Sequence, residues 1–265
     1  MNPPVNRPRN ACDAHLGFAC TTSARTNEVI QVDSKPDDVD VSSTECLKLA
    51  HKRDVFHAWI LEGLDFSRPW DMSVLAPVEA HPTALVPFSV AMHERWRDFD
   101  CFVHFYEDDF RFERVWNDPH KYLPKLSKFE GVIMPDFSTC IDFPRPLKMW
   151  NCYRNQTLGA WWQEQGLTVI PNARHQPECD WLVEGLPREC VIAICGRALV
   201  KDVAERRRLV RDVRTTVDEL RPTAIVYYGS DLYGVMDYPR SLSIPVWVYP
   251  GCGRGALDGG KCGQR

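Results

Sequence analysis

The fold is decided by two apolar runs and the segment that joins them: Val191-Ile-Ala-Ile-Cys195, residues 199–220, and Ala224-Ile-Val-Tyr-Tyr228. Both runs are apolar on both faces, which is typical of strands buried in a parallel sheet. The joining segment carries valines on one helical face and arginines largely elsewhere, and Arg221-Pro222 marks its end. A strand, a helix and a second strand in this order predict a right-handed β-α-β crossover.

The same alternation extends over most of the chain. Further short apolar runs predict strands at Phe102–Tyr106, Val132–Met134, Thr168–Ile170 and Pro245–Tyr249. A second helix is predicted from Pro146 to Gln165, with Gly166 as its C-cap. We therefore expect an α/β fold with a mostly parallel sheet and crossover helices. Six strands favour an open doubly wound sheet, and a barrel is the alternative if residues 57–61 and 84–88 add two more strands.

The ends of the chain differ in composition from its centre. Residues 1–50 are rich in Pro, Asn, Asp, Ser and Thr, have few large apolar residues, and are predicted to form a disordered tail. Residues 251–265 contain six glycines and almost nothing to bury, so we expect a flexible C-terminal tail. A single α/β domain is predicted for residues 52–250.

Composition also restricts the class of protein. The chain has 265 residues and a formal charge of −4, which gives no general attraction to nucleic acid, although a local basic patch is compatible with it. No stretch approaches the roughly 18 apolar residues of a membrane span, and the N-terminus lacks the apolar core of a signal peptide. The eleven cysteines include no C-x-x-C pair, so they predict buried apolar positions rather than a zinc or thioredoxin-type site. We expect a cytoplasmic protein that does not associate with membranes.

Polar residues follow the predicted strands at the edge where parallel α/β folds bind ligands. Asp136 and Ser138 follow one strand, and Asn172 and Arg174 follow the next. Asp136 is a candidate catalytic residue, whereas Ser138, Asn172 and Arg174 are candidate ligand-binding residues, with Arg174 suited to a phosphate or carboxylate. The alternatives are a structural ion pair between Asp136 and Arg174, or simple turn and cap roles.

Further candidates extend this predicted site. His175 is the histidine next to this edge and is the second candidate catalytic residue, for proton transfer. Gly229 and Ser230 precede a short predicted helical turn whose N–H groups suit an anion. Asn151 and Arg154 share one face of the predicted second helix and point either at the site or at buried backbone. His104, in the middle of a strand, is predicted to be a core residue.

Familiar catalytic and cofactor motifs give no support to a particular reaction. Gly255–Lys261 matches G-x-x-x-x-G-K, but Cys262 stands where a Ser or Thr would bind magnesium, and the three residues that follow cannot form the required helix. No G-x-S-x-G or H-E-x-x-H occurs. The sequence therefore identifies no cofactor and predicts no metal site.

Five ordered blocks resemble a known family. They are the block that begins Phe102-Val-His-Phe-Tyr-Glu-Asp-Asp, followed by Gly131-Val-Ile-Met-Pro-Asp-Phe-Ser138, Trp150-Asn-Cys-Tyr-Arg-Asn155, Val169-Ile-Pro-Asn-Ala-Arg174 and Val226-Tyr-Tyr-Gly-Ser230. Over about residues 85–250 the chain is similar to an uncharacterised domain family of phages and bacterial mobile elements. The resemblance implies a phage or mobile-element origin and implies no reaction.

The sequence is compatible with two functions. The leading hypothesis is that the protein binds a small anionic ligand, such as a nucleotide or a phosphorylated metabolite, at the C-terminal edge of the strands. It would do so as an enzyme or as a binding protein. The alternative is a non-catalytic protein that binds a host factor or DNA through the Arg-rich helix 201–214. A closed polar crevice favours the first hypothesis, and a flat exposed arginine surface favours the second.

Overall fold

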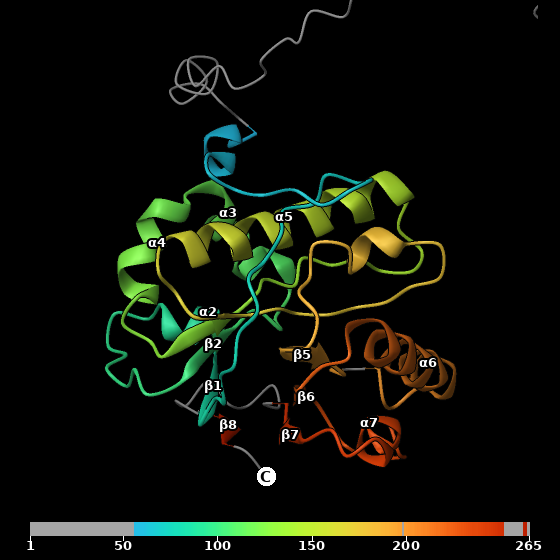
Figure 1. The fold of residues 1–265 in the computed structure, drawn as a ribbon. Helices are drawn as coiled ribbons and strands as arrows, with labels where there is room; N and C mark the ends of the chain where they lie inside the picture. The colour runs from blue at the N-terminus through green and yellow to red at the C-terminus, as the bar shows by residue number, and fades with distance from the viewer. Residues whose placement is uncertain (1–55, 198, 252–261, 264–265) are drawn as a thin grey trace, which may run out of the picture. The chain divides into compact units, whose positions relative to one another are not determined.

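A mostly parallel sheet with crossover helices forms the part of the chain that the computed structural model describes, residues 56–197, 199–251, 262 and 263 (Figure 1). The strands are β1 (Ala84–Pro87), β2 (Phe102–His104), β3 (Gly131–Ile133), β4 (Val169–Ile170), β5 (Val191–Cys195), β6 (Ala224–Tyr228), β7 (Val246–Tyr249) and β8 (Cys262–Gly263). The α-helices are α2 (Phe88–Ala91), α3 (Glu113–Asn117), α4 (Pro119–Leu126), α5 (Arg145–Glu164), α6 (Val203–Leu220) and α7 (Asp237–Ser241). Short 3-10 helices are η1 (Ala58–Leu61), η2 (Asp109–Arg111) and η3 (Asp180–Leu182).

Strand pairing follows the order of the sequence. β1 to β4 pair in parallel with their neighbours, and so do β5 to β7. β8, which the sequence did not predict, pairs antiparallel with β1 and lies within the predicted C-terminal tail. The predicted mostly parallel α/β fold is confirmed. The predicted N-terminal tail and the Gly255–Lys261 motif lie outside the described residues.

A short seam joins the two groups of strands. Beyond β4 the chain stays extended, and Ala193 of β5 pairs in parallel with Asn172. The N–H of Ala193 donates to the carbonyl of Pro171 over 2.7 Å, and its carbonyl accepts from the N–H of Ala173 over 2.8 Å. The strand order from β1 to β7 therefore never reverses. Because parallel crossovers are right-handed, such an order places the connecting helices on one face of the sheet.

The two faces of the sheet bury different partners. Side chains on one face pack with those of the helices in the main core. The other face forms a second core to which every strand from β1 to β7 contributes and no described helix does. Its members include Leu85, Phe102, Ile133, Ile170, Val191, Val226 and Tyr249. This face packs against itself, which requires the sheet to curl.

The curled sheet does not close into a barrel. Among the described strands, β7 pairs only with β6, and no pairing joins it to β1. The barrel alternative also required strands at residues 57–61 and 84–88. The second is present as β1, but Ala58–Leu61 forms the 3-10 helix η1, so the condition is not met. The ring of Trp59 lies edge-on to Trp161 with the ring centres 5.8 Å apart, so the segment covers α5 instead of extending the sheet.

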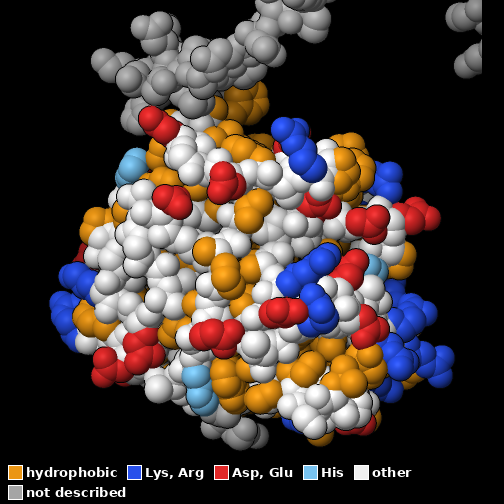
Figure 2. Space-filling view, in the orientation of Figure 1, with side chains coloured by type: hydrophobic (Ala, Val, Ile, Leu, Met, Phe, Trp, Pro, Cys, Tyr) orange, Lys and Arg blue, Asp and Glu red, His pale blue; other side chains and the backbone are white. Residues whose placement is uncertain are grey.

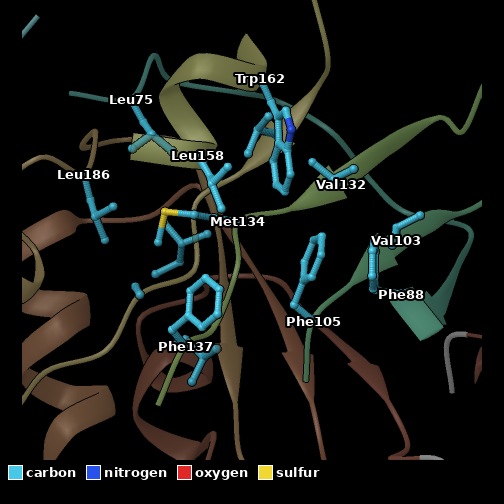
Figure 3. Close-up of a cluster of buried hydrophobic side chains, with 14 of the residues drawn as sticks. Leu75, Phe88, Val103, Phe105, Val132, Met134, Phe137, Leu158, Trp162 and Leu186 are labelled. Carbon is cyan, nitrogen blue, oxygen red and sulfur yellow. The ribbon is translucent and has the colours of Figure 1, made fainter. Parts of the chain in front are cut away.

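Helix α5 fixes much of the main core. It has Pro146 in its first turn and ends before Gly166, whose φ of 84° is a left-handed conformation that favours glycine, as predicted. Figure 3 shows Leu158 and Trp162 pointing from α5 toward the strands, near Met134. The rings of Trp162 and Phe105 stack with centres 5.5 Å apart. The aromatic face of α5 is thus a principal contact between the helices and the sheet.

Helix α6 lies against β5 and β6 and is capped at both ends. The side chain of Asp202 accepts hydrogen bonds from the N–H groups of Ala204 and Glu205, which starts the helix four residues later than predicted. Arg221, in a left-handed conformation with φ 48°, ends it before Pro222. No helix within the described ranges is long and apolar enough to cross a membrane.

Replacement of Trp162 tests the packing of α5 on the sheet. Trp162 is fully buried, so Trp162→Ala is expected to lower the free energy of unfolding by about 3–5 kcal/mol through lost contacts and an unfilled cavity. Trp70, which is 43% exposed, is the matched control, and Trp70→Ala should cost less than about 1 kcal/mol. Urea denaturation followed by far-UV circular dichroism measures both. Equal losses in the two variants would show that Trp162 is not a core contact.

Candidate functional site

A polar network joins the ends of β3 and β4. The carboxylate of Asp136 accepts hydrogen bonds from Nδ2 of Asn172 at 3.0 Å and from Nε and Nη2 of Arg174 at 2.8 and 2.5 Å. Asp136 and Asn172 are buried, whereas the side chain of Arg174 is 32% exposed. Residues separated by 38 positions in the sequence thus meet in a two-pronged ion pair, as their positions after adjacent parallel strands predicted.

The carboxylate of Asp136 keeps Arg174 in its charged form. Burial raises the pKa of Asp136 above its ordinary value, and its contacts with Arg174 and Asn172 oppose that shift. Burial alone would lower the pKa of Arg174, but the carboxylate of Asp136 outweighs this effect and the pKa of Arg174 is raised. Arg174 therefore stays protonated in the folded protein, and two of its nitrogens are bound to a single carboxylate.

Tyr106 extends the network to the end of β2. Its hydroxyl donates to Oδ1 of Asn172 over 3.0 Å, and its carbonyl accepts from Nη1 of Arg197 over 2.7 Å. Burial raises the pKa of Tyr106 well above its ordinary value, so the hydroxyl remains a donor. Tyr106 was not among the site residues predicted from the sequence. Its position immediately before Glu107-Asp-Asp109, at the same strand-end edge, was the available signal.

His104 lies beneath Tyr106 in the second core. It is fully buried, as the core prediction requires, and its Nδ1 accepts a hydrogen bond from the N–H of Tyr106 over 3.1 Å. Its ring also lies 4.5 Å from that of Tyr228, measured between ring centres. Burial, with a smaller effect of Arg197, lowers the pKa of His104 to about 3. The imidazole is therefore neutral at physiological pH.

A second network fixes the loop that follows β3. The N–H and hydroxyl of Ser138 donate to the carboxylate of Asp109, the hydroxyl over 2.9 Å. Nδ2 of Asn151 donates to the carbonyl of Ser138 over 2.6 Å, and Asn155 pairs with both backbone groups of Phe137. Three side chains outside this loop therefore hold its backbone immediately beyond Asp136.

Arg154 completes this second network. It donates to Oδ1 of Asn151 over 2.6 Å and to Glu113 over 2.8 Å, and its guanidinium lies 3.8 Å from the centre of the Phe137 ring. The hydrogen bonds of Asn151 and Arg154 thus go to the loop, to Glu113 and to each other. The structure shows both side chains bound to groups of the protein itself, and their contact with a ligand stays a prediction.

A cleft of about 470 Å³ opens beside Arg174, between the loops after β3 and β4 and the helix α6. Its apolar wall includes Ala173, Ile194, Leu209 and Val213. Its polar lining includes Arg174 and His175 from the loop after β4, and Glu205, Arg208 and Asp212 from α6. Arg208 is already paired with Glu205, whereas burial raises the pKa of Asp212 and the nearby His175 opposes that rise. Arg174 and His175, predicted together, therefore line one cavity.

Gly229 and Ser230 lie elsewhere. They line a separate, open cavity of about 410 Å³ together with Arg240 and Asp231, which form an ion pair over 2.6 Å. The N–H of Gly229 donates to the carbonyl of Tyr249 over 2.9 Å, and the next described helix is the five-residue α7, which begins at Asp237. A turn at residues 233–236 leads into α7, so a short turn does follow Gly229 and Ser230, whereas the binding of an anion there stays a prediction. Their role as ligand contacts stays a prediction, at a site apart from Asp136.

The described part of the chain contains no group of three His, Cys, Asp or Glu side chains that could hold a metal ion. Cys195, beside Asp136 and Arg174, is buried, and burial raises the pKa of its thiol to about 12. This thiol is accordingly neutral and behaves as a small core residue.

The neutral, buried state of His104 predicts sensitivity to acid. The folded-state pKa lies below the value of about 6.5 for an unfolded chain, so the unfolded state takes up the proton first and stability falls as the pH drops from about 6.5 toward 3. His104→Asn keeps an acceptor for the N–H of Tyr106 and removes the titration. Between pH 7 and pH 5, wild type should lose about 2 kcal/mol more free energy of unfolding than this variant. Parallel losses in denaturant titrations at the two pH values would contradict a buried neutral histidine.

Comparisons with known proteins show a domain family and two similar phage proteins. A family model described as "Domain of unknown function (DUF4417)" matches residues 64–243. The "Gene 1 protein" of Mycobacterium phage D29 is 30% identical over 178 residues, which cover 64% of this chain and 66% of that protein. The "Gene 1 protein" of Mycobacterium phage L5 is 27% identical over 186 residues, which cover 65% of this chain and 80% of that protein. No solved structure matches the chain. Because the family model covers more than half of the sequence, as the five resembling blocks predicted, this protein belongs to the DUF4417 family.

Proposed function

We propose that this protein binds a small ligand with an anionic group in the cleft beside Arg174, and that Arg174 and His175 contact that group. The observation that carries the proposal is the fixed orientation of Arg174. Asp136 occupies Nε and Nη2, whereas Nη1 has no hydrogen-bond partner within the described ranges, and the partly exposed side chain lines the cleft. A guanidinium held in this way is already oriented to bind a phosphate or carboxylate.

The remaining walls of the cleft suggest the body of the ligand. Ile194, Leu209 and Val213 offer an apolar surface for a ring, and Asp212 offers an acceptor for ligand N–H or O–H groups. A volume of about 470 Å³ lies within the usual range for small-molecule sites. A nucleotide or a phosphorylated metabolite combines an anionic group, hydrogen-bond donors and a compact body, and so fits this lining.

Each polar residue then has a separate part in the proposal. Asp136 positions Arg174, Asn172 donates to the carboxylate of Asp136, and Tyr106 in turn donates to Asn172. His175 brings an imidazole, a common proton-transfer group in enzymes, to the lining of the cleft, so it is the candidate catalytic residue if the bound ligand reacts. The location agrees with the general rule that ligands of parallel α/β folds bind beyond the C-terminal ends of the strands.

A thermal-shift screen of nucleoside monophosphates, sugar phosphates and inorganic phosphate tests this proposal, with the unphosphorylated nucleosides alongside. Phosphorylated compounds should raise the melting temperature, because a ligand at 100 times its Kd stabilises the folded state by about 2.7 kcal/mol, whereas the nucleosides should not. Arg174→Lys, which keeps the charge and loses the planar fork, should weaken binding of the best compound about tenfold or more.

Two further variants make the screen specific. His175→Ala removes a cleft side chain without breaking the ion pair of Asp136, and it should also weaken binding. Arg97→Lys, at an exposed arginine outside the cleft, is the matched control and should leave binding unchanged. The proposal fails if no phosphorylated compound shifts the melting temperature, or if Arg174→Lys and His175→Ala bind as well as the control.

A further inference from the structure

The two sides of α6 carry different chemistry. On the side toward the cleft lie Glu205, Arg208 and Asp212, which bring both signs of charge. The other side carries a basic face made of Arg206, Arg207, Arg211 and Arg214. Three members of the basic face, Arg207, Arg211 and Arg214, are exposed and recur at the i, i+4, i+7 spacing of a single helix face. Figure 2 shows blue side chains gathered at the lower right, where Figure 1 places α6.

Tyrosines border the basic face. The guanidinium of Arg206 lies 4.1 Å from the centre of the Tyr233 ring, and that of Arg214 lies 4.4 Å from the centre of the Tyr238 ring. Tyr233 is 69% exposed and has a left-handed backbone with φ 64°, although it is not a glycine. One face of its ring is covered by an arginine, and most of the side chain is open to solvent. An exposed aromatic ring beside a row of cations is thus built into the loop after β6.

Carboxylates lie near the basic face, at Asp202 and Asp212, but they are not paired with its arginines in the described ranges. None of its four arginines forms an ion pair with another residue in the described ranges. A carboxylate at its far end, that of Asp218, accepts a hydrogen bond from the hydroxyl of Tyr238. A local excess of positive charge therefore exists on a chain whose formal charge is −4. A polyanion is the partner that such a surface attracts.

We propose that the basic face and Tyr233 bind single-stranded nucleic acid, with phosphates on the arginines and a base stacked on the Tyr233 ring. At 1.5 Å per residue, Arg207 and Arg214 lie about 10 Å apart along the helix, which corresponds to about three nucleotides at 3.4 Å each. Stacking on an exposed ring needs an unpaired base, and this feature favours a single strand over a duplex. The surface lies on the side of α6 away from the cleft, so this proposal stands or falls independently of ligand binding.

Fluorescence anisotropy of the full chain with a labelled oligothymidine tests the proposal, and a labelled duplex serves as the comparison. With about three phosphates engaged, the logarithm of the association constant should fall with the logarithm of salt concentration with a slope of about −2. The double variant Arg207→Ala, Arg211→Ala should reduce the magnitude of that slope by about 1.4, whereas Arg207→Lys, Arg211→Lys should keep it. Arg68→Ala, at an arginine whose side chain is 86% exposed and outside the basic face, is the control and should change nothing.

Tyr233→Asn separates stacking from charge. Asn tolerates the left-handed backbone, so the loop should keep its conformation while oligothymidine binding weakens about tenfold at an unchanged salt slope. Melting temperatures of all variants check that they fold. Absence of binding at about 50 mM salt overturns the proposal. The proposal is also overturned if Arg68→Ala loses as much affinity as the double variant Arg207→Ala, Arg211→Ala. A third contrary result is a duplex that binds as tightly as the single strand together with no effect of Tyr233→Asn.

Discussion

The seam at Ala193 is the constraint on which the rest of this structure depends. Two backbone hydrogen bonds, to the carbonyl of Pro171 and from the N–H of Ala173, attach the strand group β1 to β4 to the group β5 to β7. Pro171 has no N–H to donate, so only its carbonyl contributes to this seam. Because the seam keeps the strands in sequence order, the sheet curls with its helices on one face and, on the other, a core to which no described helix contributes.

The same seam positions the candidate site. Extending the chain past β4 to pair with β5 places Asn172 over Tyr106 and Asp136, and carries Arg174 to the border between the strand ends and α6. There the ion pair with Asp136 fixes the guanidinium against the cleft. Asp136 and Arg174 thus act as one unit, in which a buried carboxylate orients a partly exposed arginine.

Much of the fold was readable from the sequence, because strands buried on both faces are continuous apolar runs and the helix limits are marked by Gly166 and Pro222. The meeting of Asp136 with Arg174 was predictable for a related reason, since residues that follow adjacent parallel strands share an edge. The order of the strands across the sheet could not be predicted from the sequence. Gly229 follows β6, which β5 separates from β4, and it lines a different cavity from Arg174. Likewise, η1 depends on the contact of Trp59 with α5, which local patterning does not contain.

A double-mutant cycle tests most directly whether Asp136 and Arg174 act as one unit. The free energy of unfolding would be measured for Asp136→Asn, for Arg174→Lys, for the two together and for wild type. Asp136→Asn leaves the charge of Arg174 without its carboxylate, and Arg174→Lys leaves the buried carboxylate of Asp136 without its two-pronged partner. Each should therefore be destabilising, and the double variant should lose less than the sum of the singles by about 1–3 kcal/mol. If the two changes add to within about 0.5 kcal/mol, the residues are independent and Asp136 does not orient Arg174.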